Sequence, residues 1–92
     1  MQKEIEVIIK GRVQMVMFRD FAKKEADSLK LCGTVKNLGD GSVDVIAQGD
    51  EEKLKEFIEK LKTGPKFAEV ENVEIQWRDI KERFNDFKII WT

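Results

Sequence analysis

The chain has 92 residues, a formal net charge of −1, and charged residues at 38% of its positions against 41% hydrophobic ones. This length provides one hydrophobic core, so we expect a single domain over residues 1–92. No apolar run approaches the roughly 20 residues of a membrane span, and the balanced charge argues against a main role in coating nucleic acid or an anionic membrane. Cys32 is the one cysteine and cannot form an internal disulfide. Because the N-terminal residues also do not resemble a signal peptide, we expect a cytoplasmic protein.

The chemistry open to this chain is limited, because it contains one cysteine, no histidine and no tyrosine. Tetrahedral zinc sites of the Cys/His type are excluded, and so are Ser-His-Asp and Cys-His relays. We therefore expect no metal and no cofactor. A reaction carried out by this chain must use arginine, lysine, carboxylates, amides and backbone groups.

The first third of the chain changes from a strand pattern to a helix pattern. Residues 3–10 predict a strand, and from Phe18 the apolar residues recur with helical spacing until Gly33 marks the end of the helix. The apolar residues of each element share one face: Ile5, Val7 and Ile9 in the strand, and Phe18, Phe21, Ala22, Ala26 and Leu29 in the helix. This helix is amphipathic and is expected to lie on a sheet.

A hairpin and a second helix follow. Residues 34–38 and 42–48 predict two strands joined by a glycine-containing turn at residues 39–41. The second helix is expected to begin after Asp50 as its N-cap and to end at Gly64. Its buried stripe consists of Leu54, Phe57, Ile58 and Leu61.

Two further strands complete the pattern, one around residues 73–77 and one around residues 87–91. Trp77 and Trp91 fall in the hydrophobic phase of these strands, so we expect them to pack in the core or on the sheet. The order β-α-β-β-α-β with a fifth strand predicts an α+β, ferredoxin-like split βαβ sandwich, with two helices on one face of a mainly antiparallel sheet. Because this fold serves enzymes, regulators and RNA-binding proteins, it does not by itself indicate a function.

The most informative segment is the loop from Gly11 to Arg19, which reads Gly-Arg-Val-Gln-Met-Val-Met-Phe-Arg. A loop between a strand and a helix presents free backbone N–H groups at the positive end of the helix dipole, where anions bind. Arg19 would add a planar guanidinium suited to phosphate oxygens. The alternative is that Arg19 is a solvated surface residue and the loop is only a connection.

This loop resembles the acylphosphatase signature Gly-x-Val-Gln-Gly-Val-x-Phe-Arg. Residues 31–38 are similar to the family block Gly-Leu-x-Gly-x-Val-x-Asn. The resemblance continues in family order through residues 39–43, 48–49 and 64–65 to Ala68 and Val70, and it covers roughly residues 5–91. It implies hydrolysis of acyl phosphates, which are carboxyl-phosphate mixed anhydrides, to a carboxylate and inorganic phosphate. It also implies a small-molecule substrate, with phosphate or similar anions as product or inhibitor.

The resemblance implies a role for each matched residue. Arg19 would bind the phosphate, Asn37 would orient the attacking water, and the backbone N–H groups of Met15, Val16, Met17, Phe18 and Arg19 would form a phosphate cradle. Residue chemistry agrees, since a carboxylate leaving group with a pKa of about 4–5 needs no general acid. Loose phosphoryl transfer asks mainly for positioning and positive charge, with the substrate's own phosphate as the proton acceptor.

Some of these residues also have structural interpretations. Asn37 suits a strand end or a local cap, which is the alternative to a catalytic role. Arg12 is expected to be a surface residue at a strand end, and Lys36 to be solvated on the other face of the sheet. Cys32 is expected to be a small core residue rather than a reactive thiol.

Met15 departs from the family pattern, which has glycine at this position. If the backbone there is left-handed, methionine costs about 1–2 kcal/mol, so we expect reduced rather than abolished activity. The competing hypothesis is a non-catalytic acylphosphatase-like module that binds a phosphorylated ligand or a protein partner. An RNA-recognition domain is a third hypothesis, disfavoured by the near-neutral charge and the lack of a Lys/Arg-Gly-Phe segment. Small size and the absence of an obvious exposed apolar patch favour a monomer.

Overall fold

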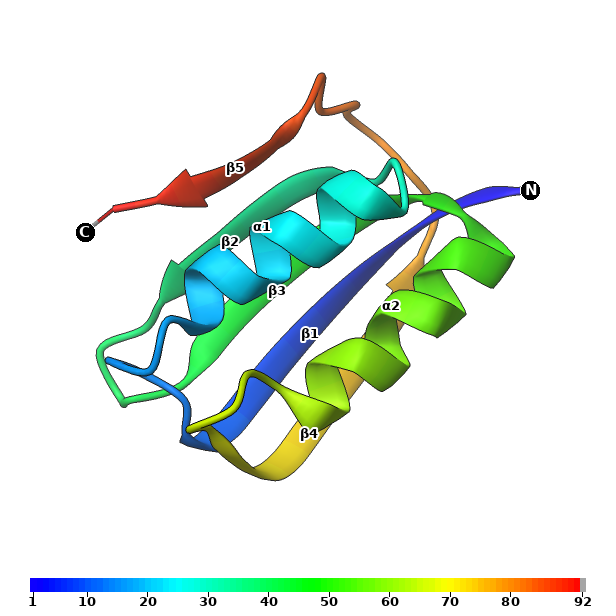
Figure 1. Ribbon diagram of the computed structural model, residues 1–92. Coiled ribbons are helices and arrows are strands. Elements are labelled where there is room, and N and C mark those ends of the chain that lie inside the picture. Colours follow the sequence, from blue (N-terminus) through cyan, green and yellow to red (C-terminus); the bar gives the residue numbers. More distant parts are fainter. Residues whose placement is uncertain (92) are drawn as a thin grey trace.

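The computed structural model describes residues 1–91, which form two helices and a five-stranded sheet (Figure 1). The elements follow in the expected order: β1 (Gln2–Arg12), α1 (Phe18–Ser28), β2 (Cys32–Asn37), β3 (Val43–Asp50), α2 (Glu51–Thr63), β4 (Glu69–Arg78) and β5 (Phe87–Ile90). Both helices begin where the sequence predicts. The strand β4 extends further toward its N-terminal end than the alternation around residues 73–77 indicates.

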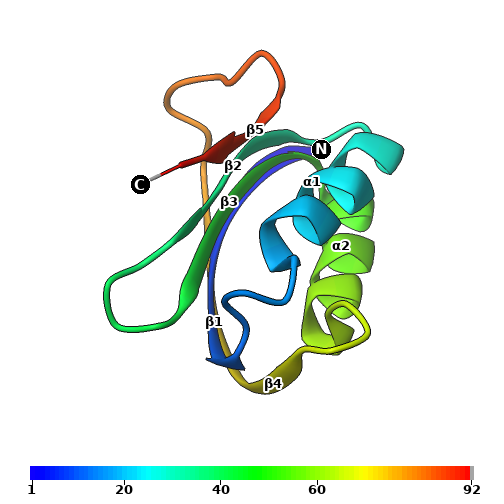
Figure 2. The ribbon, with the colours of Figure 1, turned by 60° about the vertical axis from the view of Figure 1, so that its left-hand side comes forward.

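The strand order is β4-β1-β3-β2-β5, and β5 pairs with β2 in parallel whereas all other neighbours are antiparallel. Figure 2 shows both helices on one side of the sheet, with the other side uncovered by helices. This arrangement confirms the predicted ferredoxin-like α+β fold. No helix in residues 1–91 is both long enough and apolar enough to cross a membrane.

The core lies between the helices and the sheet. Ile5, Val7 and Ile9 of β1 are fully buried under the helices, as their alternation predicts. The central strand β3 is also buried on its other face, where Asp44 and Gln48 lie. Gln48 is covered by the segment between β4 and β5: its Nε2 donates to the carbonyl of Glu82 at 2.6 Å, and its Oε1 accepts from the N–H of Phe84 at 3.0 Å.

The end of α1 differs from the prediction that Gly33 marks it. Lys30 has φ 59°, and the N–H groups of Lys30 and Leu31 donate to the carbonyls of Asp27 and Ala26, which is a Schellman motif. A lysine therefore takes the left-handed position that glycine normally occupies. Gly33 lies instead within β2, where a Cβ would stand 1.8 Å from the carbonyl oxygen of Ile46.

The boundaries of α2 follow the prediction, although the capping interaction does not. Asp50 is the residue before the helix, but its side chain makes no capping hydrogen bond. Gly64 ends the helix with φ 71°, and a Cβ there would lie 3.0 Å from the ring of Phe18. This glycine lets the chain turn close beneath the first residue of α1.

Three side chains expected in the core are more exposed than predicted. Trp77 faces the helices but lies on the edge strand β4, and 41% of it is exposed. Trp91 follows the end of β5 and is 67% exposed, so the prediction that it packs in the core or on the sheet is wrong. Cys32 is only partly buried, at the start of β2. Trp77 and Trp91 have the predicted phase, but the strand edge or end leaves them without full cover. Cys32 pairs with Gln48 and therefore lies on the sheet face away from the helices.

Candidate functional site

The loop between β1 and α1 begins at a break in the sheet. The register of β1 against β4 shifts between Lys10 and Gly11, and Gly11 has φ 131°. A Cβ at this position would lie 2.1 Å from the carbonyl oxygen of Glu69, so only glycine fits. Arg12, the last residue of β1, is exposed and pairs with Glu69 at 2.9 Å, which confirms its assignment as a surface residue.

Two methionines in the loop have left-handed backbones. Met15 has φ 63° and Met17 has φ 64°, whereas φ of Val16 between them is not positive. The left-handed backbone considered as one possibility for Met15 is therefore present, and nothing in the sequence indicated that of Met17. When left-handed residues alternate with residues of negative φ, successive N–H groups turn toward one side and form a concavity that binds anions.

The backbone N–H groups of this loop are free to bind a ligand. Within residues 1–91, the N–H groups of Met15 to Arg19 have no hydrogen-bond acceptor; the first bond of the helix runs from the N–H of Phe21 to the carbonyl of Met17 at 3.0 Å. These groups stand at the N-terminal end of α1, where the helix dipole contributes a partial positive charge. The loop thus has the donors that an oxyanion requires.

Gln14 joins the loop to the β2–β3 hairpin. Its Nε2 donates to the carbonyls of Leu38 and Ser42, both at 2.8 Å. These two residues flank the turn that directly follows Asn37. In the sequence Gln14 is one residue of the matched motif, and only the folded structure shows that it connects the loop to the hairpin.

The loop, the end of β2 and the C-terminal segment enclose a cavity of about 440 Å³. The residues lining it are Val13, Met15, Met17, Phe18, Arg19, Asp20, Asn37 and Trp91. The structure therefore brings together Arg19 and Asn37, the two residues expected to act on the substrate. Of the five residues expected in the cradle, Val16 alone does not line this cavity, because its side chain packs against the core.

Arg19 has no carboxylate partner within ion-pair distance in residues 1–91. Its guanidinium carbon lies 4.2 Å from the centroid of the Trp91 ring, which is a cation–π contact. Such a contact covers one face of the guanidinium and leaves the N–H groups at its edge available. A planar cation with free edge donors is suited to bind phosphate oxygens.

Asn37 is the last residue of β2, and its Oδ1 is buried without a hydrogen-bond partner in the described chain. The alternative role as a local cap is not what the structure shows. The turn is held instead by Asp40, whose Oδ1 accepts from the N–H of Ser42 at 3.0 Å and from its hydroxyl at 2.5 Å. These bonds lower the pKa of Asp40. An unpaired amide beside a cavity is costly unless a ligand or water satisfies it.

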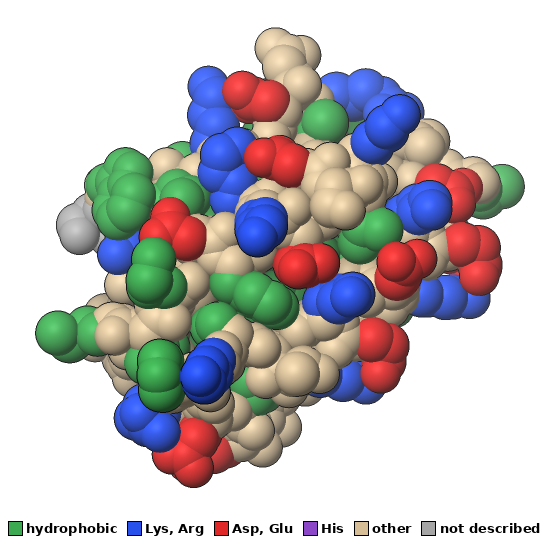
Figure 3. Space-filling view, in the orientation of Figure 1, with side chains coloured by type: hydrophobic (Ala, Val, Ile, Leu, Met, Phe, Trp, Pro, Cys, Tyr) green, Lys and Arg blue, Asp and Glu red, His purple; other side chains and the backbone are tan. Residues whose placement is uncertain are grey.

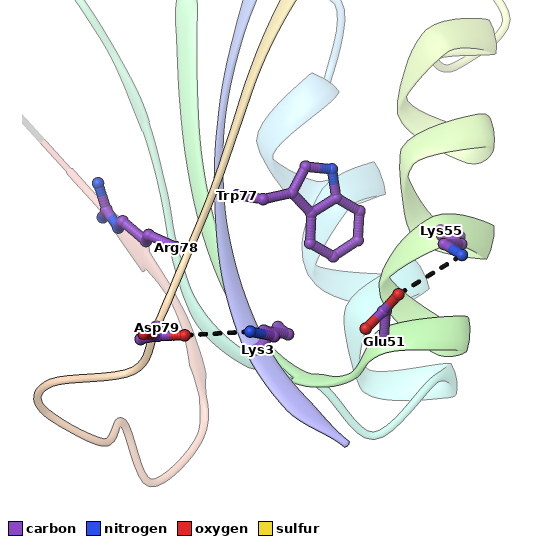
Figure 4. A pocket seen from close by; sticks show the side chains of 6 residues that line it. All are labelled: Lys3, Glu51, Lys55, Trp77, Arg78 and Asp79. Atoms are coloured by element: carbon purple, nitrogen blue, oxygen red, sulfur yellow. Dashed lines mark hydrogen bonds and ion pairs between the residues drawn. The ribbon is translucent and has the colours of Figure 1, made fainter.

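A larger cavity of about 560 Å³ lies elsewhere, between the edge strand β4 and α2 (Figure 4). Two of its lysines have carboxylate partners at its wall: Lys3 pairs with Asp79 at 3.0 Å, and Lys55 with Glu51 at 3.6 Å. No group of three or more histidine, cysteine or acidic side chains in residues 1–91 could hold a metal ion. The cavity at the loop is thus the better candidate for anion chemistry.

Comparison with known proteins agrees with this site. The Acylphosphatase family model matches residues 5–89. The chain belongs to the acylphosphatase family. It is 45% identical to an acylphosphatase of Dehalococcoides mccartyi (strain CBDB1) over 86 residues, which is 92% of this chain and 94% of the relative. Identity to the acylphosphatase of Caldanaerobacter subterraneus subsp. tengcongensis is also 45%, over 97% of this chain and 99% of the relative.

A solved structure supports the same conclusion. The crystal structure of acylphosphatase from Bacillus subtilis superposes with a TM-score of 0.93, at 39% identity, over 98% of this chain and 99% of that one. As a member of this family, the chain is an enzyme that hydrolyses acyl phosphates. The hypothesis of a non-catalytic module is not favoured.

Proposed function

We propose that Arg19 and the backbone N–H groups of residues 15–19 hold the phosphoryl group, and that Asn37 orients the water that attacks it. The observation that carries this proposal is the shared cavity, where within residues 1–91 Arg19 has no carboxylate partner and the loop N–H groups have no acceptor. Charge on the equatorial oxygens of a loose transition state is stabilised by such fixed donors.

The reaction needs no further catalytic group. Water attacks phosphorus as the bond to the acyl oxygen breaks, and the leaving carboxylate is stable without protonation. The proton of the water passes to a phosphate oxygen of the substrate. Product phosphate keeps the charge that Arg19 and the cradle recognise, so inorganic phosphate and similar anions are expected to inhibit competitively.

The test is hydrolysis of benzoyl phosphate, followed by its ultraviolet absorbance. Arg19→Ala is expected to lower kcat/KM by on the order of 10³-fold, since it removes the fixed charge that meets the transition state. Asn37→Ala is expected to lower kcat by on the order of 10²-fold with a smaller change in KM, because it leaves phosphate binding in place.

Arg12→Ala is the matched control, since Arg12 borders the same loop but is paired with Glu69 and does not line the cavity. It is expected to keep kcat/KM within about twofold of the parent. Equal activity of the parent and Arg19→Ala, with both proteins folded, would overturn the proposed roles.

We also propose that residues 1–92 act as one domain, as a monomer and in the cytoplasm. The single cysteine supports a reducing compartment. The expectation of no exposed apolar patch is wrong, because Met15, Met17 and Trp91 are exposed; their position around the cavity leaves substrate as the group that covers them. Size-exclusion chromatography with light scattering tests the monomer directly.

A further inference from the structure

Three exposed hydrophobic side chains gather around the candidate site. Met15 is 100% exposed, Met17 70% and Trp91 67%, and all three line the same cavity. Figure 3 shows hydrophobic side chains collected at the side of the molecule where the chain ends. We name Met15, Met17 and Trp91 the apolar rim.

Phosphate binding does not account for these side chains. The cradle uses backbone N–H groups, which any residue at positions 15 and 17 would supply. A left-handed backbone also favours glycine, so methionine at both positions costs about 1–2 kcal/mol each and exposes apolar surface as well. The side chains therefore require an explanation separate from the phosphoryl group.

The charges at the cavity restrict what can occupy the rest of it. Arg19 is the one cation among the residues that line it, and Asp20 adds a carboxylate. With Arg19 engaged by phosphate, no lining cation remains for a second negative group on the substrate. The remaining surface is that of two flexible thioethers and an indole, which favour contact with aromatic rings.

We propose that the apolar rim binds the acyl group of the substrate and selects apolar acyl phosphates, with an aromatic acyl group preferred over a small or charged one. This inference rests on the proposed function, because it places the acyl group next to a phosphoryl group held at Arg19. The rim residues determine specificity and take no part in the chemical step.

The experiment compares kcat/KM for benzoyl phosphate and acetyl phosphate, which share the reacting group and differ in the acyl group. Trp91→Ala and Met17→Ala are each expected to lower the benzoyl-to-acetyl ratio of kcat/KM by about fivefold, within the range for apolar groups in a binding pocket. Trp91 also contacts Arg19, and loss of that contact affects both substrates alike, so the ratio isolates the acyl contact. Succinyl phosphate, whose acyl group carries a carboxylate, is expected to have the lowest kcat/KM of the three.

Phe67→Ala is the matched control. Phe67 is an aromatic residue with the same 67% exposure as Trp91, but it does not line the cavity. It is expected to leave the ratio unchanged. An unchanged ratio in Trp91→Ala and Met17→Ala, with Arg19→Ala inactive on both substrates, would overturn the inference and leave the proposed function standing.

Binding measurements separate the two proposals further. Benzylphosphonate and methylphosphonate carry the same anion and are not hydrolysed. Calorimetry is expected to show tighter binding of benzylphosphonate than of methylphosphonate to the parent, and a preference about fivefold smaller in Trp91→Ala. Full hydrolysis by Arg19→Ala would overturn the proposed function. Equal binding of the two phosphonates to the parent would overturn the proposal that the apolar rim binds the acyl group.

Discussion

Two cavities of this protein are each lined by an arginine and a tryptophan, and they differ in how the arginine is paired. At the loop, Arg19 lies against Trp91 and has no carboxylate partner among residues 1–91. Between β4 and α2, Arg78 and Trp77 are neighbours on one strand and point to opposite faces of the sheet (Figure 4). Arg78 forms ion pairs with Glu4 and, at 3.2 Å, with Glu6.

The difference shows how one residue type serves two purposes. The guanidinium of Arg78 is satisfied within the protein, and its carboxylate partners raise its pKa further. That arrangement joins β1 to β4 and leaves no charge for a ligand. Arg19 is held by an uncharged ring, so its charge remains available for a phosphate. The larger cavity is thus a structural feature, and the smaller one has the free positive charge that catalysis on an anion requires.

Alanine substitution of the two arginines should give opposite results, and this is the largest effect we expect. Arg78→Ala leaves the nearly buried Glu4 without a cation, although Gln48 still donates to it. The variant should lower the free energy of unfolding by about 2–3 kcal/mol, with kcat/KM of the folded enzyme unchanged. Arg19→Ala should lower kcat/KM by about 10³-fold and cost less than about 1 kcal/mol in stability. Urea denaturation and benzoyl phosphate hydrolysis measure the two quantities; a larger loss of stability in Arg19→Ala would remove the distinction between the cavities.

Met15→Gly tests whether the methionine of the apolar rim lowers the stability of the protein. Glycine accepts φ 63° without strain, so the free energy of unfolding should rise by about 1 kcal/mol or less, because the unfolded chain also gains freedom. Acetyl phosphate hydrolysis should increase by several-fold as access to the cradle opens, and the benzoyl-to-acetyl ratio should fall as rim contact is lost.

Val16→Gly is the contrasting variant for this loop. Val16 does not have a positive φ and packs against the core, so replacing it with glycine removes apolar contacts and should lower stability. A gain of stability in both variants would show that the loop is loose in general and that Met15 is not specifically strained.

Much of this architecture follows from local sequence pattern. The strands of β1 and β3, the start of α1 at Phe18 and the span of α2 follow from periodicity and glycine positions. Arg19 and Asn37 could be chosen in advance because they lie in matched motifs. Gln14 joins their two segments, and its contacts to the hairpin cross between distant parts of the chain and leave no periodic signal.

The wrong predictions about burial share a physical cause. Alternation along a strand indicates which face a side chain lies on, but it does not indicate whether other residues pack over that side chain. Trp91 has the correct phase but follows the last residue of β5, so it covers Arg19 in place of the core. Asp44 alternates with the buried Val43 and Val45 and so lies on the opposite face of β3. It is nevertheless 5% exposed, because its strand is central and its neighbours' side chains close over it. Left-handed residues such as Met17 and Lys30 are set by the closure of a loop or a helix end, which residue type alone did not reveal.

Asp44 offers a test of whether the charges near Arg78 affect the stability of the protein without affecting its activity. Burial raises the pKa of Asp44 to about 7, assisted by a hydrogen bond to Glu6 and by the charge of Glu6; Lys36 and Arg78 act in the opposite direction. The hydrogen bond from Asp44 is in turn the main cause that lowers the pKa of Glu6. Because the folded protein holds the Asp44 proton more tightly than the unfolded chain, this group's contribution to stability is lost as the pH rises from about 4 to about 7.

Asp44→Asn should remove that dependence, since an amide can donate to Glu6 at every pH. The variant should be more stable than the parent at pH 8 by on the order of 1 kcal/mol and similar to it near pH 4, with benzoyl phosphate hydrolysis unchanged. Urea denaturation across this pH range measures the effect. A destabilised variant at pH 8 would mean that Asp44 is charged in the folded protein and pairs with Lys36 or Arg78.

Substitution of Lys30 is expected to have the smallest effect on stability. It is the reference for the strain at Met15, because Lys30 has a left-handed backbone but lies outside both cavities. In the Schellman motif at the end of α1, Lys30→Gly should raise the free energy of unfolding by about 0.5–1 kcal/mol, the usual preference for glycine at this position. Lys24 is a matched control: it is an exposed lysine within the same helix, and Lys24→Gly should lower stability by a similar amount because glycine disfavours a helix interior. Since Lys30 is remote from the cradle, its replacement should leave both acyl phosphates' kcat/KM unchanged. A stability gain shared by Lys30→Gly and Met15→Gly, with altered hydrolysis only in Met15→Gly, would show that strain at the loop is coupled to the reaction and strain at the helix end is not.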